Sequence, residues 1–236
     1  MLNEALKLIK LAYEDGRTFL LEHEAKSLCM LYNIPTTLFK VAQDVDEALQ
    51  AAREIGYPVV IKIISRDIIH KSDVGGVIVN IRSDEEAINA CKIIENNVLR
   101  HNPNAKIDGF LVEKMAQPTT EVIVGMIKDP QFGPAIMFGL GGIFVEVLKD
   151  VSFRVVPLTR YDAEEMIKEI KAYPILKGIR GRPPADIEAL INIILNVSKM
   201  SSEISEINQI DLNPIFTYPK GAITVDARII LEKRQL

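Results

Sequence analysis

The run Pro58-Val-Val-Ile-Lys-Ile-Ile64 constrains the fold of this chain more than any other feature of its sequence. β-Branched residues dominate the run, and it is too short for a helix, which predicts a strand buried in a sheet. Its one charge, Lys62, carries a desolvation penalty at such a position. The ammonium group therefore either reaches water at the strand end or faces an anion such as a ligand phosphate, and the position alone leaves both open.

The rest of the chain alternates helical and strand patterns, which predicts an α/β (α+β) protein of two mixed lobes. We expect one lobe over residues 1–108, with the leading helices, and a second over residues 109–236, where longer strands alternate with Pro and Gly turns. Helices are predicted over residues 2–15, 22–32, 45–55, 83–99, 162–172 and 185–200. Asn3 and Asp44 are the expected N-caps of the first and third of these helices, and Ser83 and Glu86 form an expected capping box at the fourth. Strands are predicted over residues 37–41, 58–64, 77–81, 110–115, 121–128, 135–140, 143–148, 207–216 and 222–230.

Composition excludes several classes of protein. The chain carries 28 Lys and Arg against 32 Asp and Glu, a net charge of −4, which argues against binding nucleic acid over a broad surface. Cys29 and Cys91 do not form a CxxC motif and are expected to be buried thiols in a reducing compartment. The N-terminal residues do not read as a signal peptide, and no apolar run approaches the roughly 20 residues that cross a bilayer. We therefore expect a cytoplasmic protein without a membrane or nucleic-acid partner.

The loop His70-Lys-Ser-Asp-Val-Gly-Gly76 joins two predicted strands. Paired glycines let a backbone approach a phosphate closely, and exposed amides there bind anions, although a plain connecting loop has the same composition. The imidazole of His70 can act as a nucleophile that accepts a phosphoryl group, and the alternative is a surface or structural histidine. The loop is not a Walker A motif, because GxxxxGK[ST] is absent.

A group of oxygen ligands lies near the C-terminus. Asp211 and Asn213 are two residues apart on one predicted strand, so they share a face. Antiparallel pairing about the Tyr-Pro-Lys-Gly turn would bring Asp226 beside Asn213. Hard oxygen ligands on one face suit Mg²⁺ bound together with nucleotide phosphates, and the alternative is three acceptors with separate turn or edge roles.

A glycine-rich stretch, Phe138-Gly-Leu-Gly-Gly-Ile-Phe-Val-Glu146, is followed by Asp150 and Arg154. Alone it predicts a tight hairpin, with an anion pocket lined by the later charges as the alternative.

Together, strand residue Lys62, HKSDVGG, LVEKM, GLGGIFVEVLKD and IDLNP…VDAR resemble the ATP-grasp β subunits of ADP-forming acyl-CoA synthetases, the group that includes the ADP-forming acetate–CoA ligases. The resemblance runs from about Leu20 to Leu231 and implies an ATP-grasp fold, with a nucleotide cleft between the two lobes. It also implies a role for each matching position. Lys62 would contact the nucleotide phosphates under a loop containing Gly75 and Gly76, and Asp211, Asn213 and Asp226 would hold Mg²⁺. The adenine would be lined by Glu113, Lys114 and Met115, and Glu121 would lie near the ribose. His70 would take the phosphoryl group, with Glu146 and Arg154 near the path of that group.

The implied reaction is acyl-CoA + ADP + phosphate ⇌ carboxylic acid + CoA + ATP, catalysed by an acid–thiol ligase. CoA binding and the acyl phosphate stage would belong to a separate α subunit, by resemblance in an α₂β₂ heterotetramer. Two other hypotheses stay open at this point. One is a nucleotide-binding module that only regulates a partner, and the other is an ATP-grasp carboxylate–amine ligase, which needs neither His70 nor an α subunit.

Overall fold

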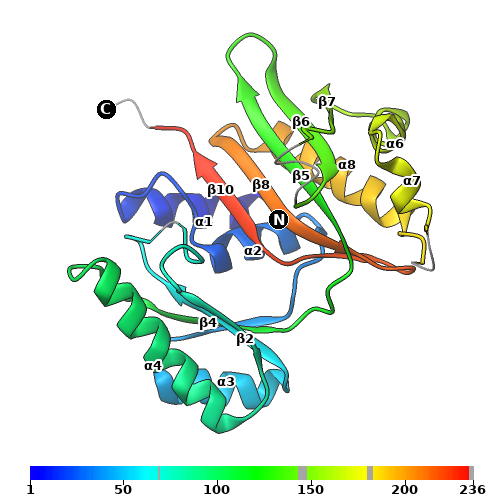
Figure 1. Ribbon diagram of the computed structural model, residues 1–236. Coiled ribbons are helices and arrows are strands. Elements are labelled where there is room, and N and C mark those ends of the chain that lie inside the picture. Colours follow the sequence, from blue (N-terminus) through cyan, green and yellow to red (C-terminus); the bar gives the residue numbers. More distant parts are fainter. Residues whose placement is uncertain (69, 143–147, 180–182, 234–236) are drawn as a thin grey trace. The chain divides into compact units, whose positions relative to one another are not determined.

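The computed structural model describes residues 1–68, 70–142, 148–179 and 183–233, and the chain divides into two compact units (Figure 1). Unit 1 comprises Met1–Thr36 and Gln117–Leu236, and unit 2 comprises Thr37–Ala116. This division differs from the lobes expected over residues 1–108 and 109–236. The strand Gly109–Lys114 pairs with Phe39–Ala42 and Val59–Ile64, both in unit 2, and the first two helices pack in the core of unit 1. The nucleotide cleft expected between the lobes stays a prediction.

Unit 2 is a four-stranded antiparallel sheet in the order β1-β4-β2-β3, with two helices. Its elements are β1 (Phe39–Ala42), α3 (Val45–Ile55), β2 (Val59–Ile64), β3 (Val77–Ile81), α4 (Asp84–His101) and β4 (Gly109–Lys114). The predicted buried strand is confirmed, because Val59, Ile61 and Ile63 of β2 pack with α3 and α4 in one apolar core. Strand alternation turns Lys62 to the opposite face of the sheet.

Polar side chains fix where the helices of unit 2 begin. Asp44 is the N-cap of α3 and accepts a hydrogen bond from the Glu47 N–H (2.9 Å), as predicted. Ser83 likewise caps α4 by accepting from the Glu86 N–H (3.2 Å). The Glu86 carboxylate accepts from the Arg82 N–H (2.6 Å), one residue before the expected partner of a capping box.

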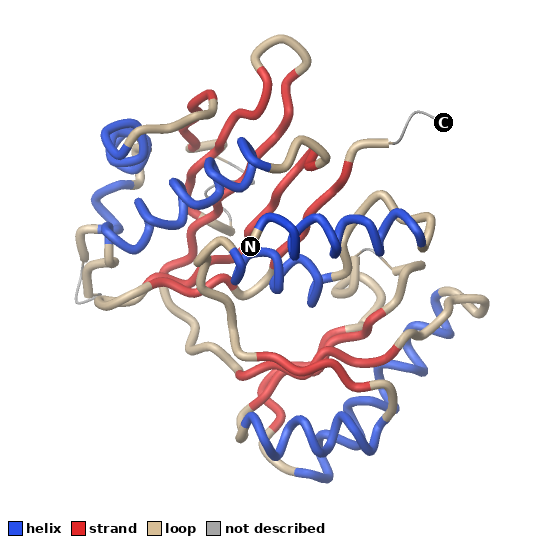
Figure 2. Tube along the Cα trace, turned by 180° about the vertical axis from the view of Figure 1, so that it is seen from behind, coloured by secondary structure: helices blue, strands red, loops and turns tan. Residues whose placement is uncertain are grey.

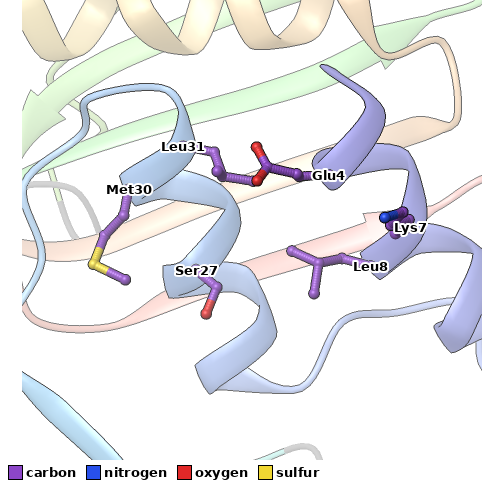
Figure 3. Close-up of a pocket in the computed structure, with 6 residues that line it drawn as sticks. All are labelled: Glu4, Lys7, Leu8, Ser27, Met30 and Leu31. Carbon is purple, nitrogen blue, oxygen red and sulfur yellow. The ribbon is translucent and has the colours of Figure 1, made fainter. Parts of the chain in front are cut away.

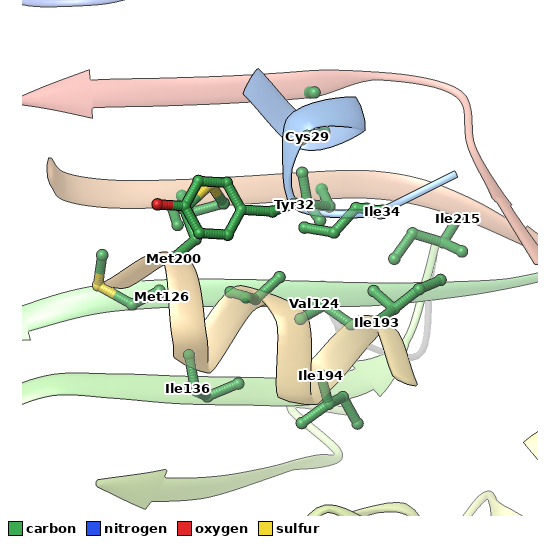
Figure 4. Close-up of a cluster of buried hydrophobic side chains, with 14 of the residues drawn as sticks. Cys29, Tyr32, Ile34, Val124, Met126, Ile136, Ile193, Ile194, Met200 and Ile215 are labelled. Carbon is green, nitrogen blue, oxygen red and sulfur yellow. The ribbon is translucent and has the colours of Figure 1, made fainter. Parts of the chain in front are cut away.

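Unit 1 contains a larger antiparallel sheet in the order β10-β8-β5-β6-β7, with β9 paired to β8. Its strands are β5 (Thr120–Asp129), β6 (Gly133–Leu140), β7 (Val151–Val155), β8 (Ile207–Thr217), β9 (Ala222–Thr224) and β10 (Ala227–Leu231). Its helices are α1 (Leu2–Glu14), α2 (Glu22–Leu31), α6 (Arg160–Glu169), α7 (Tyr173–Leu176) and α8 (Ile187–Glu203). Figure 2, from behind, shows helices over one face of this sheet. The core lies between, where Met126 and Ile136 meet Ile193 and Met200 of α8 (Figure 4).

Several predicted elements of unit 1 have different bounds. α1 begins behind Met1, so Asn3 lies in its first turn rather than at the N-cap. The helix expected over 162–172 ends at Glu169, because the Asp150 carboxylate accepts from the amides of Lys171 and Ala172 (both 2.8 Å). The strand expected over 143–148 falls mostly on residues 143–147, which lie outside the described residues.

The C-terminal hairpin departs from the prediction in one detail. The strand expected over 222–230 is interrupted at Val225 and Asp226, which separates β9 from β10. Pro214 lies opposite Val225 and has no N–H to contribute to the ladder. The register is the same on both sides of the break, since Ile215 pairs with Thr224 and Leu212 with Ala227.

Along the described ranges of the chain, no helix has both the length and the apolar character that a membrane span requires.

Candidate functional site

The predicted oxygen ligands of unit 1 come together on the sheet face opposite the helices. Ile210 and Leu212 of β8 point into the core, so Asp211 and Asn213 point to the other face. Asp226 lies directly across from Asn213, whose N–H donates to the Asp226 carbonyl (3.2 Å). The pairing expected about the Tyr-Pro-Lys-Gly turn is therefore confirmed.

Asp211 is the electrostatically unusual member of this group. Its Oδ1 is buried and has no hydrogen-bond partner among the residues that the structure describes. Burial raises the pKa of Asp211 above the ordinary value, and the nearby Asp226 carboxylate raises it further. Arg228, its partner across β10, has the opposite and smaller effect on that pKa. Two carboxylates thus lie close enough to repel each other in a half-buried setting.

This arrangement fits a divalent cation. A bound cation would satisfy the orphaned Asp211 oxygen and relieve the repulsion with Asp226, and the donors are the hard oxygens that Mg²⁺ takes. Within the described part of the chain, no three His, Cys, Asp or Glu side chains form a metal-binding group. The candidate set is therefore two carboxylates and one amide, which leaves positions for water and phosphate oxygens.

Lys62 is buried and paired. Its side chain is 7% exposed, and its Nζ lies 3.4 Å from Oε2 of Glu113, whose side chain is 1% exposed. The same carboxylate oxygen accepts a hydrogen bond from the Thr37 hydroxyl (3.2 Å). Escape of the ammonium group to water at the strand end is therefore ruled out, and its contact with a phosphate stays a prediction.

The segment Glu113–Met115, expected to line adenine, has several groups engaged within unit 2. The Lys114 ammonium donates to the carbonyls of Gly56 (2.7 Å) and Tyr57 (3.0 Å), which ties the end of α3 to β4. The N–H groups of Lys114 and Met115 donate to the carbonyls of Leu38 and Pro58. Recognition of an adenine edge by this segment stays a prediction, and these two N–H groups are already occupied.

The glycine pair is held inside its own loop. The Gly75 N–H donates to Ser72 O (3.1 Å), and the Gly76 N–H to Lys71 O (2.7 Å). Gly76 packs so closely that a Cβ would lie 2.8 Å from Cγ2 of Ile63. A phosphate contact through these two amides would require the loop to rearrange. His70 lies exposed in the same loop.

The remaining predicted positions are spread over unit 1. Glu121 of β5 lies against the glycine-rich turn, since its carbonyl accepts from the Gly141 N–H (2.9 Å). Arg154 of β7 pairs with Glu169 of α6 (2.7 Å). Glu146 lies outside the described residues. The roles assigned to these three side chains stay predictions.

Sequence reasoning missed two partners of the candidate residues. Glu113 was expected near adenine, but its carboxylate pairs with Lys62. A lone acid at the end of the apolar run Phe110–Val112 was the available signal, since a buried charge needs a partner. Arg228 of β10 is the direct cross-strand partner of Asp211 on β8, and its position two residues after Asp226 could have indicated this.

A separate pocket of about 480 Å³ lies between α1 and α2 (Figure 3). Its lining comprises Glu4, Lys7, Leu8, Ser27, Met30 and Leu31. None of the predicted site residues lines it, so it is not part of the candidate site.

Comparison with known proteins places these observations in a family. The profile of the ATP-grasp domain family matches residues 11–231. The β subunit of acetate–CoA ligase (ADP-forming) I from Pyrococcus furiosus is 56% identical over 228 residues, which are 97% of this chain and 98% of that subunit.

Two solved structures of acetyl-coenzyme A synthetase 1 from Ca. Korarchaeum cryptofilum are also similar. The complex with coenzyme A, Ca-AMPCP and HgCl⁺ has a TM-score of 0.94 at 53% identity, covering 96% of this chain and 99% of that one. The complex with coenzyme A and Mg-AMPPCP, whose phosphohistidine segment points towards the nucleotide binding site, has a TM-score of 0.86 at 49% identity, covering 97% and 100%.

Proposed function

This chain belongs to the ATP-grasp family and, within it, to the β subunits of ADP-forming acetate–CoA ligases, and from that premise we propose that it is the nucleotide-binding subunit of such an enzyme. The reaction is acyl-CoA + ADP + phosphate ⇌ carboxylic acid + CoA + ATP. The observation that carries the proposal is the buried Asp211 oxygen, which has no hydrogen-bond partner within the described ranges and lies beside Asp226 and Asn213, a set of ligands suited to a magnesium nucleotide.

In this proposal, Asp211, Asn213 and Asp226 hold Mg²⁺ together with the phosphates of ADP. The bound cation neutralises phosphate charge and orients the oxygens of the nucleotide. Asp211 is ready for this task because its unpaired oxygen and the adjacent carboxylate favour a cation over continued repulsion. The related structure that contains Mg-AMPPCP supports the choice of metal and nucleotide.

Lys62 is proposed to neutralise a nucleotide phosphate on the same ligand. Glu113, whose carboxylate also accepts from the Thr37 hydroxyl, holds the Lys62 ammonium group in a buried setting, where a charge acts more strongly than in water. Phosphoryl transfer depends mainly on positioning and charge neutralisation, so a fixed cation on a buried strand is well suited to it.

His70 is proposed to carry the phosphoryl group to ADP. A ring nitrogen of His70 attacks the phosphorus of a phosphohistidine on the companion subunit, so one P–N bond forms as the other breaks. An oxygen of the ADP β-phosphate then attacks, the P–N bond at His70 breaks, and the ring nitrogen keeps the electron pair. Exposure of His70 on a loop suits this exchange, and the phosphohistidine segment named for the related structure supports it.

The companion is proposed to be a CoA-binding α subunit, which carries the acyl phosphate stage, in an α₂β₂ assembly in the cytoplasm. The Pyrococcus furiosus relative is itself a β subunit, and the related structures contain coenzyme A.

The test first incubates this chain with its companion subunit, acetyl-CoA and ³²P-labelled phosphate, and then adds MgADP. We expect ATP formation and acid-labile, base-stable label on this chain before ADP is added. His70→Ala should remove that label and lower ATP formation by at least about 100-fold. His101→Ala, which changes an exposed histidine at the end of α4, is the matched control and should behave as the unmodified chain. Full ATP formation by His70→Ala would refute the shuttle, and amide formation without the companion would refute the synthetase function.

A further inference from the structure

On the face of the unit 1 sheet opposite the described helices, charged and apolar residues lie side by side in the same row. One row of paired residues crosses five strands, from Arg228 to Asp211, Gly125, Met137 and Phe153. The first two belong to the candidate metal region on β10 and β8. The last three, on β5, β6 and β7, carry no charge. The candidate metal site is therefore continuous, within a single row of the sheet, with an apolar surface.

The next row extends the apolar surface. Ile127, Ala135 and Val155 pair across β5, β6 and β7. With Gly125, Met137 and Phe153 they form a surface that we call the apolar block. Large side chains in it are open to solvent: Ile127 is 55% exposed, and Phe153 and Val155 are each 50% exposed. Contiguous exposed apolar surface of this kind marks interaction sites.

The helices of unit 1 that the structure describes lie on the other side of the sheet from this block. On the same three strands, the alternate residues Val124, Met126 and Ile136 point into the helix-packed core. Ser152 of β7 donates to the carbonyl of Met166 in α6 (2.8 Å), which places α6 on that core side. Strand alternation therefore turns the apolar block to the opposite face, seen from the front in Figure 1.

The edge beside the block suits a protein partner. At the other edge of the sheet, residues 18–20 cover β10, since Leu20 N–H donates to Ile229 O and Leu231 N–H to Thr18 O. β7 is the last strand in the sheet order, and no other described strand pairs with its outer edge. Such an edge offers backbone groups to a polypeptide. A small apolar ligand would leave these backbone groups unused.

We propose that the apolar block is the docking surface of the CoA-binding companion subunit. The inference rests on the proposed function, which requires that subunit to deliver a phosphoryl group to the nucleotide. The Pyrococcus furiosus relative is named as the β subunit of its enzyme, so that enzyme contains another polypeptide, and under the proposed function this chain needs a surface for its counterpart. The block lies on the same sheet face as Asp211, so a subunit seated there would approach the candidate metal site from that face.

The test uses the full chain with the companion subunit. We expect Phe153→Glu with Val155→Glu to weaken the Kd for the companion by roughly 30-fold or more, the loss typical of a hot spot. MgADP affinity of the isolated chain should stay within about twofold, because the metal residues lie on other strands. Phe153→Leu should keep the complex. Leu11→Glu, which changes an equally exposed apolar residue on α1 (55%), is the matched control and should also keep it.

Unchanged binding of the companion by the doubly substituted chain would overturn the proposal. It would also be overturned if the unmodified chain formed dimers that Phe153→Glu dissociates, since a second copy would then occupy the block. Failure of the proposed function gives a different result, because the unmodified chain would then neither bind MgADP nor support ATP synthesis, whatever the state of the complex.

Discussion

The buried carboxylate of Asp211 destabilises the folded chain at neutral pH, although the proposed function requires it as a metal ligand. Its pKa is raised in the folded chain, so the folded state holds the proton more tightly than the unfolded state does. The stability associated with this group is full below the ordinary pKa of 3.8 and is lost as the pH rises through the raised value. At neutral pH, without a cation, the ionised carboxylate therefore lowers the free energy of unfolding.

We expect Asp211→Asn to raise the melting temperature of the ligand-free chain at pH 7 and to leave it nearly unchanged below pH 4. The same substitution should abolish the extra stabilisation that Mg²⁺ gives in the presence of ADP, because one metal ligand is lost. Thermal unfolding across this pH range, with and without MgADP, measures both effects. A melting temperature at pH 7 that is lower than that of the unmodified chain would contradict the repulsion between Asp211 and Asp226.

The buried Lys62–Glu113 pair allows structure and function to be separated. Lys62→Met leaves the Glu113 carboxylate buried without its cation, which should lower the free energy of unfolding by about 3–5 kcal/mol. Adding Glu113→Gln should recover most of that loss, because the orphaned charge is removed. MgADP affinity should stay at least about tenfold weaker in both variants, since the charged contact to phosphate is missing. Urea unfolding and calorimetric titration provide the two readouts.

Recovery of nucleotide affinity in the double variant would show that Lys62 serves only the core. At this scale, the sequence correctly predicted that Asp211, Asn213 and Asp226 come together, since strand alternation and hairpin register depend on local rules. It did not reveal that Glu113 pairs with Lys62. That contact depends on β4 lying next to β2, and the 44 residues of chain between the two strands (65–108) give no local sign of this pairing.

Among the elements, the loop between β2 and β3 differs most from its expected role. Its glycines were expected to offer amides to phosphate, but both amides are used within the loop, and Gly76 packs against β2. Two adjacent glycines in a loop indicate that another group approaches the backbone closely. They do not indicate whether that group is a ligand or a side chain of the protein itself.

We expect Gly76→Ala to lower the free energy of unfolding by about 1–3 kcal/mol, because its Cβ would overlap Ile63 and approach Lys71 O at 3.0 Å. Ser72→Ala, an exposed position in the same loop, is the control and should change stability by no more than about 0.5 kcal/mol. Denaturant unfolding measures both. An unchanged stability for Gly76→Ala would show that the loop opens at little cost, which would favour its amides as phosphate ligands.

Most helices and strands were predicted to within a few residues, because their periodicity and caps are local. The two departures with a clear cause involve distant partners. α6 ends early because Asp150 binds the amides that follow it, and the last hairpin is interrupted where Pro214 faces Val225. In each case the deciding residue lies at least 11 positions away in the chain, beyond the range of the pattern itself.

At the scale of the whole molecule, the chain builds two separate apolar cores rather than one. The sequence indicated two units but not which residues belong to each. The change to longer predicted strands near Gly109 does not coincide with the point where the chain returns to unit 1, at Gln117. The leading helices pack with strands that follow residue 117, and no local signal records so distant a pairing.

The discontinuous composition of unit 1 also has a consequence for synthesis. Tyr13 donates to the carbonyl of Glu232 (2.8 Å), and the segment around Leu20 pairs with β10. After unit 2 has left the ribosome, translation must continue for on the order of ten seconds before β10 and Glu232 emerge. Unit 2 can therefore form its own core during translation, whereas the apolar faces of α1 and α2 stay exposed until β10 has been synthesised. A ribosome stalled before residue 227 would carry a nascent chain in which unit 2 is folded and α1 and α2 lack their final partner strand. A chaperone would bind these two helices.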